Sequence, residues 1–110
     1  MIRLMLEQAG HEVSTASDGQ KGVYLLEDDM VDLVVTDILM PAKDGLEAIR
    51  EIHSRYPQVK ILAISGGSHR FEELDFLGAA ERFGAARTLA KPFSRAQLLD
   101  AVEQLLAPNP

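Results

Sequence analysis

The sequence contains neither cysteine nor tryptophan among its 110 residues. The absence of cysteine excludes a disulfide framework, a thiolate metal site and a cysteine nucleophile. The apolar runs extend over only a few residues, far short of the ~18–20 that a membrane-spanning helix needs. Glu7 and Gln8 interrupt the apolar start of the chain, so no targeting segment is visible. We therefore predict a cytoplasmic protein with no membrane partner.

Basic residues are scarce relative to acidic ones. Lysine and arginine number 11 against 17 aspartates and glutamates, which gives a formal net charge of -6. An acidic chain gains no attraction from a phosphate backbone, so we predict no nucleic-acid partner. The hydrophobic content of 46% and the charged content of 25% are typical of a globular protein that buries its own core. A chain of this length is expected to form one domain.

Helical and strand-like patterns alternate along the chain. Apolar residues recur at helical spacing over residues 1–9. Strands are expected at 31–37, which contains the continuous apolar run 33–35, and at 59–64, and such apolar stretches are typical of parallel strands covered on both faces. Shorter strands are expected at 11–16 and 87–91. The pattern predicts an α/β fold of four strands and five helices, in which a parallel sheet lies between two helical layers.

Local signals mark the ends of some expected helices. Asp18 precedes the second helix as an N-cap, and Ser94 with Gln97 has the spacing of a capping box before the last helix. After the strand at 31–37, the pair Asp44–Gly45 predicts a turn. The third helix is therefore expected to begin near Leu46.

Polar side chains stand where several of the expected strands end. Asp37, Ser65 and Lys91 occupy three of these ends, and ligands of parallel sheets bind beyond the carboxyl ends of the strands. Asp37 can act as a nucleophile or a metal ligand, while a hydroxyl and an ammonium suit the oxygens of a phosphoryl group. Each residue also has an ordinary structural interpretation as a turn former, a loop serine or a solvated lysine. Their joint placement favours an anion site.

Several motifs follow one another in order along these strand ends. They are Asp37-Ile38-Leu39-Met40-Pro41, Asp44-Gly45, Ile61-Leu62-Ala63-Ile64-Ser65-Gly66, Gly84-Ala85 and Lys91-Pro92-Phe93. With this ordered set the chain resembles the receiver domain of bacterial two-component response regulators, a flavodoxin-like doubly wound parallel sheet. The resemblance spans nearly all of the chain. It implies a receiver domain over residues 1–107, followed by a tail at residues 108–110.

The resemblance implies a role for each site residue. Asp37 accepts a phosphoryl group from a histidine kinase or phosphotransfer protein, and Ser65 and Lys91 contact the phosphoryl oxygens. Asp37 and the backbone carbonyl of Leu39 bind Mg²⁺. The bond before Pro92 is expected to be cis, as it often is in the family. The chain is then expected to be a phosphoprotein that modifies only its own Asp37, and not an enzyme acting on other molecules.

Two features depart from the family pattern. The helix near Met1 matches the first helix of a receiver, so the family's first strand and its acidic pair are missing from the sequence. We therefore expect weak Mg²⁺ binding, impaired phosphorylation of this truncated form, and a gap in the sheet that a homodimer can fill. Thr88 stands at the switch position, three residues before Lys91, where many receivers have an aromatic side chain.

Alternative functions are weighed against this one. The strongest is a phosphorylation-independent, receiver-like module for protein interaction, which the missing acids and Thr88 favour. A phosphotransfer bundle with a reactive His53 is disfavoured by the buried strands, and a flavin carrier by an aromatic content of 5%. His11, His53 and His69 share no metal-ligand spacing, so we expect surface positions for them.

Overall fold

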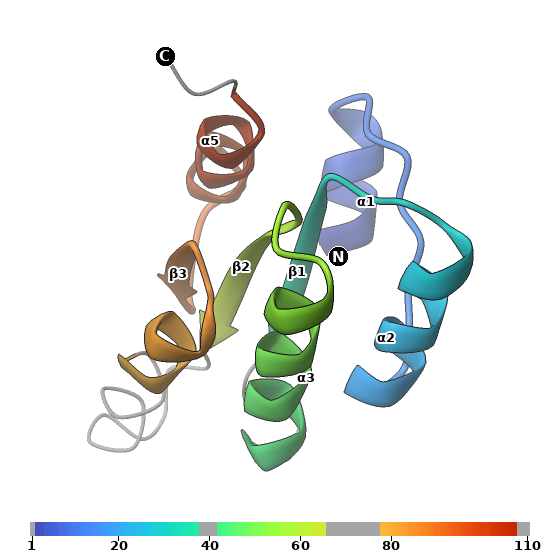
Figure 1. The fold of residues 1–110 in the computed structure, drawn as a ribbon. Helices are drawn as coiled ribbons and strands as arrows, with labels where there is room; N and C mark the ends of the chain where they lie inside the picture. Colours follow the sequence, from blue (N-terminus) through green and yellow to red (C-terminus); the bar gives the residue numbers. More distant parts are fainter. Residues whose placement is uncertain (1, 38–41, 66–77, 108–110) are drawn as a thin grey trace.

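Three parallel strands form the sheet of the computed structural model, which describes residues 2–37, 42–65 and 78–107. They are hydrogen-bonded in the order β1 (Leu33–Asp37), β2 (Lys60–Ser65) and β3 (Arg87–Ala90). Figure 1 shows β2 between the other two strands. In the register, Val35 lies beside Leu62, and Leu62 lies beside Arg87. Because the strands run parallel, all three carboxyl ends lie at the same edge of the sheet.

Helices cover both faces of this sheet (Figure 1). They are α1 (Ile2–Gln8), α2 (Gly19–Asp28), α3 (Ala42–Arg55), a helical segment at residues 78–83, and α5 (Arg95–Leu106). One core cluster joins the sheet to α2, α3 and the segment 78–83, and the other joins it to α1 and α5. No helix in the described part of the chain is long and apolar enough to cross a bilayer.

β2 is the strand that divides the two core clusters. Its side chains alternate between the faces, so that Ile61 belongs to the cluster under α3 and Leu62 to the cluster under α5. Both residues are 0% exposed. A strand with neighbours on both edges and helices on both faces requires a continuous apolar run, and β2 has one.

The predicted capping signals of two helices are confirmed. The Asp18 carboxylate accepts a hydrogen bond from the N–H of Lys21 at 2.9 Å at the start of α2. At the start of α5, the Ser94 hydroxyl accepts from the N–H of Gln97 at 3.1 Å, and the Gln97 side chain accepts from the N–H of Ser94 at 2.8 Å. The caps therefore satisfy one backbone donor at the start of α2 and two at the start of α5.

Two contacts position α3 against its neighbours. Gly84 has a φ of +129°, and a Cβ at this position would collide with the side chain of His53, so only glycine fits the turn before β3. Arg55 reaches across to α2, where its Nη2 lies 3.0 Å from Glu27, and its Nη1 lies 3.1 Å from Glu51 of its own helix. These hydrogen bonds raise the pKa of Arg55 above its ordinary value.

Several sequence-based expectations need correction. Residues 11–16, predicted as a strand, form neither helix nor strand, so the described residues contain three strands where four were expected. A strand needs a neighbour for its backbone hydrogen bonds, and no described strand pairs with these residues. The turn predicted at Asp44–Gly45 is also wrong, because α3 begins at Ala42 and includes both residues. The predicted tail at 108–110 lies outside the described residues.

Candidate functional site

The carboxyl ends of the three strands bring together the polar residues singled out in the sequence. Asp37 ends β1, Ser65 ends β2, and Lys91 directly follows the end of β3. The backbone N–H of Lys91 donates to the carbonyl of Ser65 at 2.8 Å, which extends the contact between β2 and β3 by one residue. The three residues therefore share one edge of the sheet, which is the edge where parallel sheets bind ligands.

An ion pair joins the two charged residues of this set. Nζ of Lys91 lies 3.0 Å from Oδ2 of Asp37, and the two side chains are 44% and 32% exposed. At this exposure water screens the attraction, so the pair adds little to the stability of the fold. The ion pair instead holds the compact positive charge of Lys91 beside the carboxylate of Asp37, which is partly exposed to solvent.

Ser65 differs from these two residues because it is fully buried. Its exposed fraction is 0%, and its Oγ has no hydrogen-bond partner within the described residues. Most buried hydroxyls are paired, and an unpaired one costs about 1–3 kcal/mol. A hydroxyl in this state has an unused hydrogen-bond donor at the end of the strand between Asp37 and Lys91.

Asp37 is the carboxylate that the described strands themselves supply at this edge. Asp32 precedes β1 at the opposite end of the strand, and Asp18 caps α2. In the part of the chain that the structure describes, no group of three or more His, Asp or Glu side chains is placed to hold a metal. Mg²⁺ prefers near-octahedral coordination by oxygens and usually keeps several waters, so Asp37 would supply one carboxylate ligand of such a site. Leu39, the other expected ligand, lies outside the described residues.

Two further expected features lie on β3 and just beyond it. The peptide bond between Lys91 and Pro92 is cis, as the resemblance implied. Thr88 lies beside Ala63 of β2 and is partly buried. Its side chain is much smaller than an aromatic ring, so the swing of a large ring cannot carry a signal at this position.

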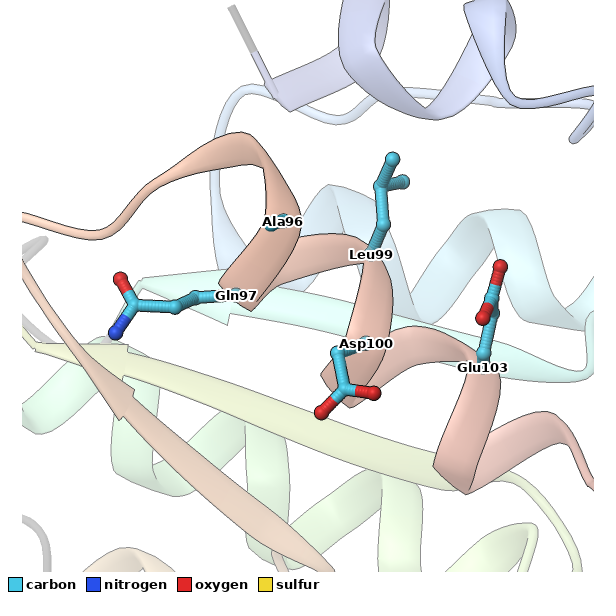
Figure 2. Close-up of a pocket in the computed structure, with 5 residues that line it drawn as sticks. All are labelled: Ala96, Gln97, Leu99, Asp100 and Glu103. Atoms are coloured by element: carbon cyan, nitrogen blue, oxygen red, sulfur yellow. The ribbon is translucent and has the colours of Figure 1, made fainter.

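A shallow hollow also lies on the surface of α5. Its lining comes from this one helix, namely Ala96, Gln97, Leu99, Asp100 and Glu103. Figure 2 shows that the polar ends of Gln97, Asp100 and Glu103 point in different directions. Ligand sites bring a few polar groups to bear on one point, and this hollow does not. The edge at Asp37 is therefore the better candidate site.

Comparison with known proteins decides the family. The model of the response regulator receiver domain matches residues 1–103. The chain belongs to the response regulator receiver family. It is 39% identical over 101 residues to the transcriptional regulatory protein PdtaR of Mycobacterium tuberculosis, and 29% identical over 106 residues to the alkaline phosphatase synthesis transcriptional regulatory protein PhoP of Bacillus subtilis. These matches cover 90% and 96% of the chain but 46% and 42% of the relatives, so this receiver spans less than half of their length.

Solved structures share the fold of this receiver. The receiver domain of NtrX from Brucella abortus superimposes with a TM-score of 0.85 at 30% identity, covering 96% of this chain and 86% of that chain. A response regulator from Thermotoga maritima gives a TM-score of 0.81 at 26% identity, covering 96% and 84%. The predicted flavodoxin-like receiver fold is confirmed, with the correction to the strand count given above.

One property of the molecule was missed by reasoning from the sequence. The hydroxyl of Ser65 is both buried and unpaired in the described structure, although its place after four apolar residues of β2 was a signal of burial. A gap in the sheet was predicted, and the outer side of β1 has no strand partner among the described residues. Residues 11–16, which were predicted as a strand, do not form one beside β1.

Proposed function

We propose that this receiver accepts a phosphoryl group on the carboxylate of Asp37, transferred from the phosphohistidine of a histidine kinase or a phosphotransfer protein. One observation carries the proposal: a carboxylate, an ammonium 3.0 Å from it and a buried unpaired hydroxyl occupy the ends of adjacent strands. Phosphoryl transfer requires the protein mainly to position the reacting groups and to neutralise the negative charge on the phosphoryl oxygens. Asp37, Lys91 and Ser65 supply a nucleophile, a cation and a hydrogen-bond donor for this purpose.

The proposed transfer forms one bond and breaks another. An oxygen of Asp37 attacks the phosphorus atom, the new P–O bond forms as the P–N bond to the histidine breaks, and the leaving nitrogen takes up a proton from solvent. The phosphoryl group brings a charge of about -2 to the edge of the sheet. Lys91 then interacts with a phosphoryl oxygen, and the Ser65 hydroxyl donates a hydrogen bond to another. The only residue modified is Asp37, so the domain acts as a switch and turns over no other molecule.

Magnesium is associated with receiver domains as a family, and we expect weak binding by this one. Asp37 provides a carboxylate and Leu39 is expected to provide a carbonyl, which leaves most of the coordination to water. Mg²⁺ loses its water reluctantly, so a site with few protein oxygens holds it loosely. Phosphorylation is therefore expected to be slower than in a receiver with a complete set of acids.

A cytoplasmic location and a protein partner fit this function. The domain needs contact with a kinase or a phosphotransfer protein, and with neither a nucleic acid nor a membrane. Its net charge of -6 agrees with that choice of partner.

A second candidate is a receiver-like interaction module that works without phosphate. It is favoured by Thr88 at the switch position and by the described residues, among which no group of three or more His, Asp or Glu side chains is placed to hold a metal. In such a module the surface of the domain would recognise a partner in one fixed state.

The two candidates separate in a phosphorylation experiment with acetyl phosphate. Incubation with Mg²⁺ should add one phosphoryl group, detected by intact-protein mass spectrometry and removed by hydroxylamine. Asp37→Asn should abolish the addition, because an amide is a poor nucleophile. Asp32→Asn is the matched control, because it replaces an aspartate just before the first residue of β1, away from the site. This variant should still gain one phosphoryl group.

Each other outcome has a definite meaning. Addition that persists in Asp37→Asn contradicts the assignment of Asp37. A complete absence of addition in the unmodified protein at high Mg²⁺ supports the phosphorylation-independent module. Tight, saturable binding of beryllofluoride with Mg²⁺ contradicts the expectation of a weak metal site.

A further inference from the structure

The outward side of α2 carries apolar side chains where an amphipathic helix is expected to be polar. Val23 and Leu26 belong to the core cluster that α2 shares with α3 and the sheet. Tyr24 and Leu25, by contrast, are 54% and 40% exposed. Figure 1 shows α2 beside α3 at the outer end of its layer. These two side chains therefore form an apolar pair on the exposed side of the helix.

A charged residue stands about one turn away from the apolar pair on each side along the helix. Lys21 comes three residues before Tyr24, and Asp28 comes three residues after Leu25. At about 100° per residue, these four side chains lie within one stripe about 100° wide, opposite the buried side of the helix. We call Lys21, Tyr24, Leu25 and Asp28 the α2 stripe.

The two charged ends of the α2 stripe have no partner of opposite sign in the described part of the chain. Neither the Lys21 ammonium nor the Asp28 carboxylate takes part in an ion pair there. Two helical turns, about 10 Å, separate the two residues, which exceeds the spacing of ion pairs within a helix. Asp28 also lies at the negative end of the helix dipole, and the last turn of α2 contains no basic residue. A cation supplied from another molecule is therefore favourable beside Asp28.

The ring of Tyr24 is already held in place at the centre of the stripe. Nε2 of Gln20 donates a hydrogen bond to the hydroxyl oxygen of Tyr24 at 3.0 Å. Because Gln20 lies one turn earlier, this bond holds the ring along the helix, toward its N-terminal end. A side chain that is fixed beforehand loses less entropy when it docks. Tyrosine is also one of the residues that are enriched at protein interfaces.

The α2 stripe is complementary to a second copy of itself turned end for end. In a contact across a two-fold axis, a residue that meets a second residue of the partner is met by its own counterpart in return. With the axis midway between Tyr24 and Leu25, each of these residues meets the other type in the partner helix. Lys21 of each copy then meets the partner's Asp28. A basic helix from another protein would pair with Asp28 but would repel Lys21.

We propose that the α2 stripe is the contact surface of a homodimer, in which two α2 helices pack antiparallel across a two-fold axis. The contact consists of an apolar centre with an ion pair at each end. Since α2 ends shortly before β1 begins, it runs roughly antiparallel to the strands (Figure 1). The carboxyl edges of the two sheets then point in opposite directions, and both Asp37 residues stay accessible. The dimer does not depend on the proposed chemistry at Asp37.

The proposed dimer is expected to be weak. Two helices of 10 residues bury less than the ~1,200 Å² that is typical of stable complexes. Two chains of net charge -6 also repel each other. At about 0.15 M salt the screening length is about 8 Å, which reduces this long-range repulsion more than it weakens ion pairs in contact. We expect a dissociation constant on the order of 0.1 mM under these conditions.

Sedimentation equilibrium of the full chain, at concentrations up to about 1 mM, measures this association. Asp28→Lys places a lysine opposite the partner's Lys21 at both ends and should weaken the dimer at least about tenfold. The same change makes the chain two charges less negative, so general repulsion falls and cannot explain a loss of dimer. The double variant Lys21→Glu with Asp28→Lys keeps the net charge and exchanges the two ends. It should restore the dissociation constant to within about threefold.

Two controls on α5 distinguish the α2 stripe from other surfaces. Asp100→Lys makes the same change of charge at an exposed position of α5, and it should not weaken the dimer. The chain has no cysteine, so Leu25→Cys introduces a single thiol near the two-fold axis. A short bismaleimide should join two copies through this thiol. The same reagent should give little cross-linking with Glu103→Cys, whose thiol would lie on α5.

Several results would overturn the proposal. A monomeric mass at about 1 mM would do so, as would a dimer that Asp28→Lys leaves intact. An equal loss with Asp100→Lys, or a folded double variant that stays monomeric, would place the contact elsewhere. Circular dichroism verifies the fold of each variant. If Asp28→Lys does not fold, the cross-linking of Leu25→Cys against Glu103→Cys still decides the matter, and equal yields would contradict the contact at α2.

Discussion

β1 and β2 have similar sequences but lie in different surroundings. Both are aliphatic runs that end in a polar side chain, Asp37 in one strand and Ser65 in the other. From Ile61 to Ser65 the residues of β2 are at most 1% exposed, whereas every residue of β1 is only partly buried. β2 has a strand on each side, and β1 has one on a single side among the described residues. Burial in a sheet is therefore decided by neighbours as much as by hydrophobicity.

The largest expected effect comes from truncating a core side chain on each strand. Leu62→Ala in β2 should lower the free energy of unfolding by about 3 kcal/mol, because it leaves a cavity in a fully packed place. Val35→Ala in β1 should lower it by about 1 kcal/mol, since water already reaches this side chain. Urea unfolding monitored by circular dichroism measures both. Equal losses would show that the outer side of β1 is covered in solution.

A pair of glycines extends the comparison to the turns. Gly84→Ala should lower the free energy of unfolding by about 2 kcal/mol, because the new Cβ would strain a positive φ and collide with His53. Gly10 also has a positive φ, but a Cβ there would have no atom within 4 Å. Gly10→Ala should therefore cost only the backbone strain, about 1 kcal/mol. Thermal unfolding of the two variants side by side measures the difference. A larger loss for Gly10→Ala would contradict the close approach of Gly84 to His53.

The smallest expected change in stability is at Ser65. Ser65→Ala removes a buried hydroxyl with no partner in the described structure, so the free energy of unfolding should stay the same or rise by up to about 1 kcal/mol. The same variant should gain less phosphate from acetyl phosphate, because the donor to the phosphoryl oxygen is gone. Urea unfolding and mass spectrometry measure the two effects on one preparation. A clear loss of stability would mean that the hydroxyl already has a partner.

Local chemistry in the sequence was a reliable guide where the interaction is local. Asp18 and the pair of Ser94 and Gln97 cap α2 and α5 as predicted, because a cap depends on groups two or three residues apart. The buried run of β2 was equally clear, since its surroundings on all sides agree with its composition. These elements needed no knowledge of the rest of the chain.

Predictions that depended on distant groups were less successful. Residues 11–16 have strand-like residues such as Val13, but a strand exists only when another strand pairs with it. The pair Asp44–Gly45 reads as a turn in isolation, yet Gly45 is buried in the first turns of α3. Packing of α3 against the sheet outweighs the local preference there. In both cases the sequence did not show which element packs beside the segment: a strand partner for residues 11–16, and the sheet under α3 for Asp44–Gly45.

The sequence by itself determined the order of the helices and of the three strands β1, β2 and β3, the family, and the presence of Asp37, Ser65 and Lys91 at strand ends, because these follow from periodicity and from ordered motifs. Only the tertiary structure decided that Lys91 lies 3.0 Å from Asp37 and that the hydroxyl of Ser65 is buried and unpaired in the described residues. Only it decided which side of β1 has no strand partner among the described residues. The physical reason is that periodicity reports a residue's own preference, whereas distance, burial and pairing belong to residues that are far apart in the chain.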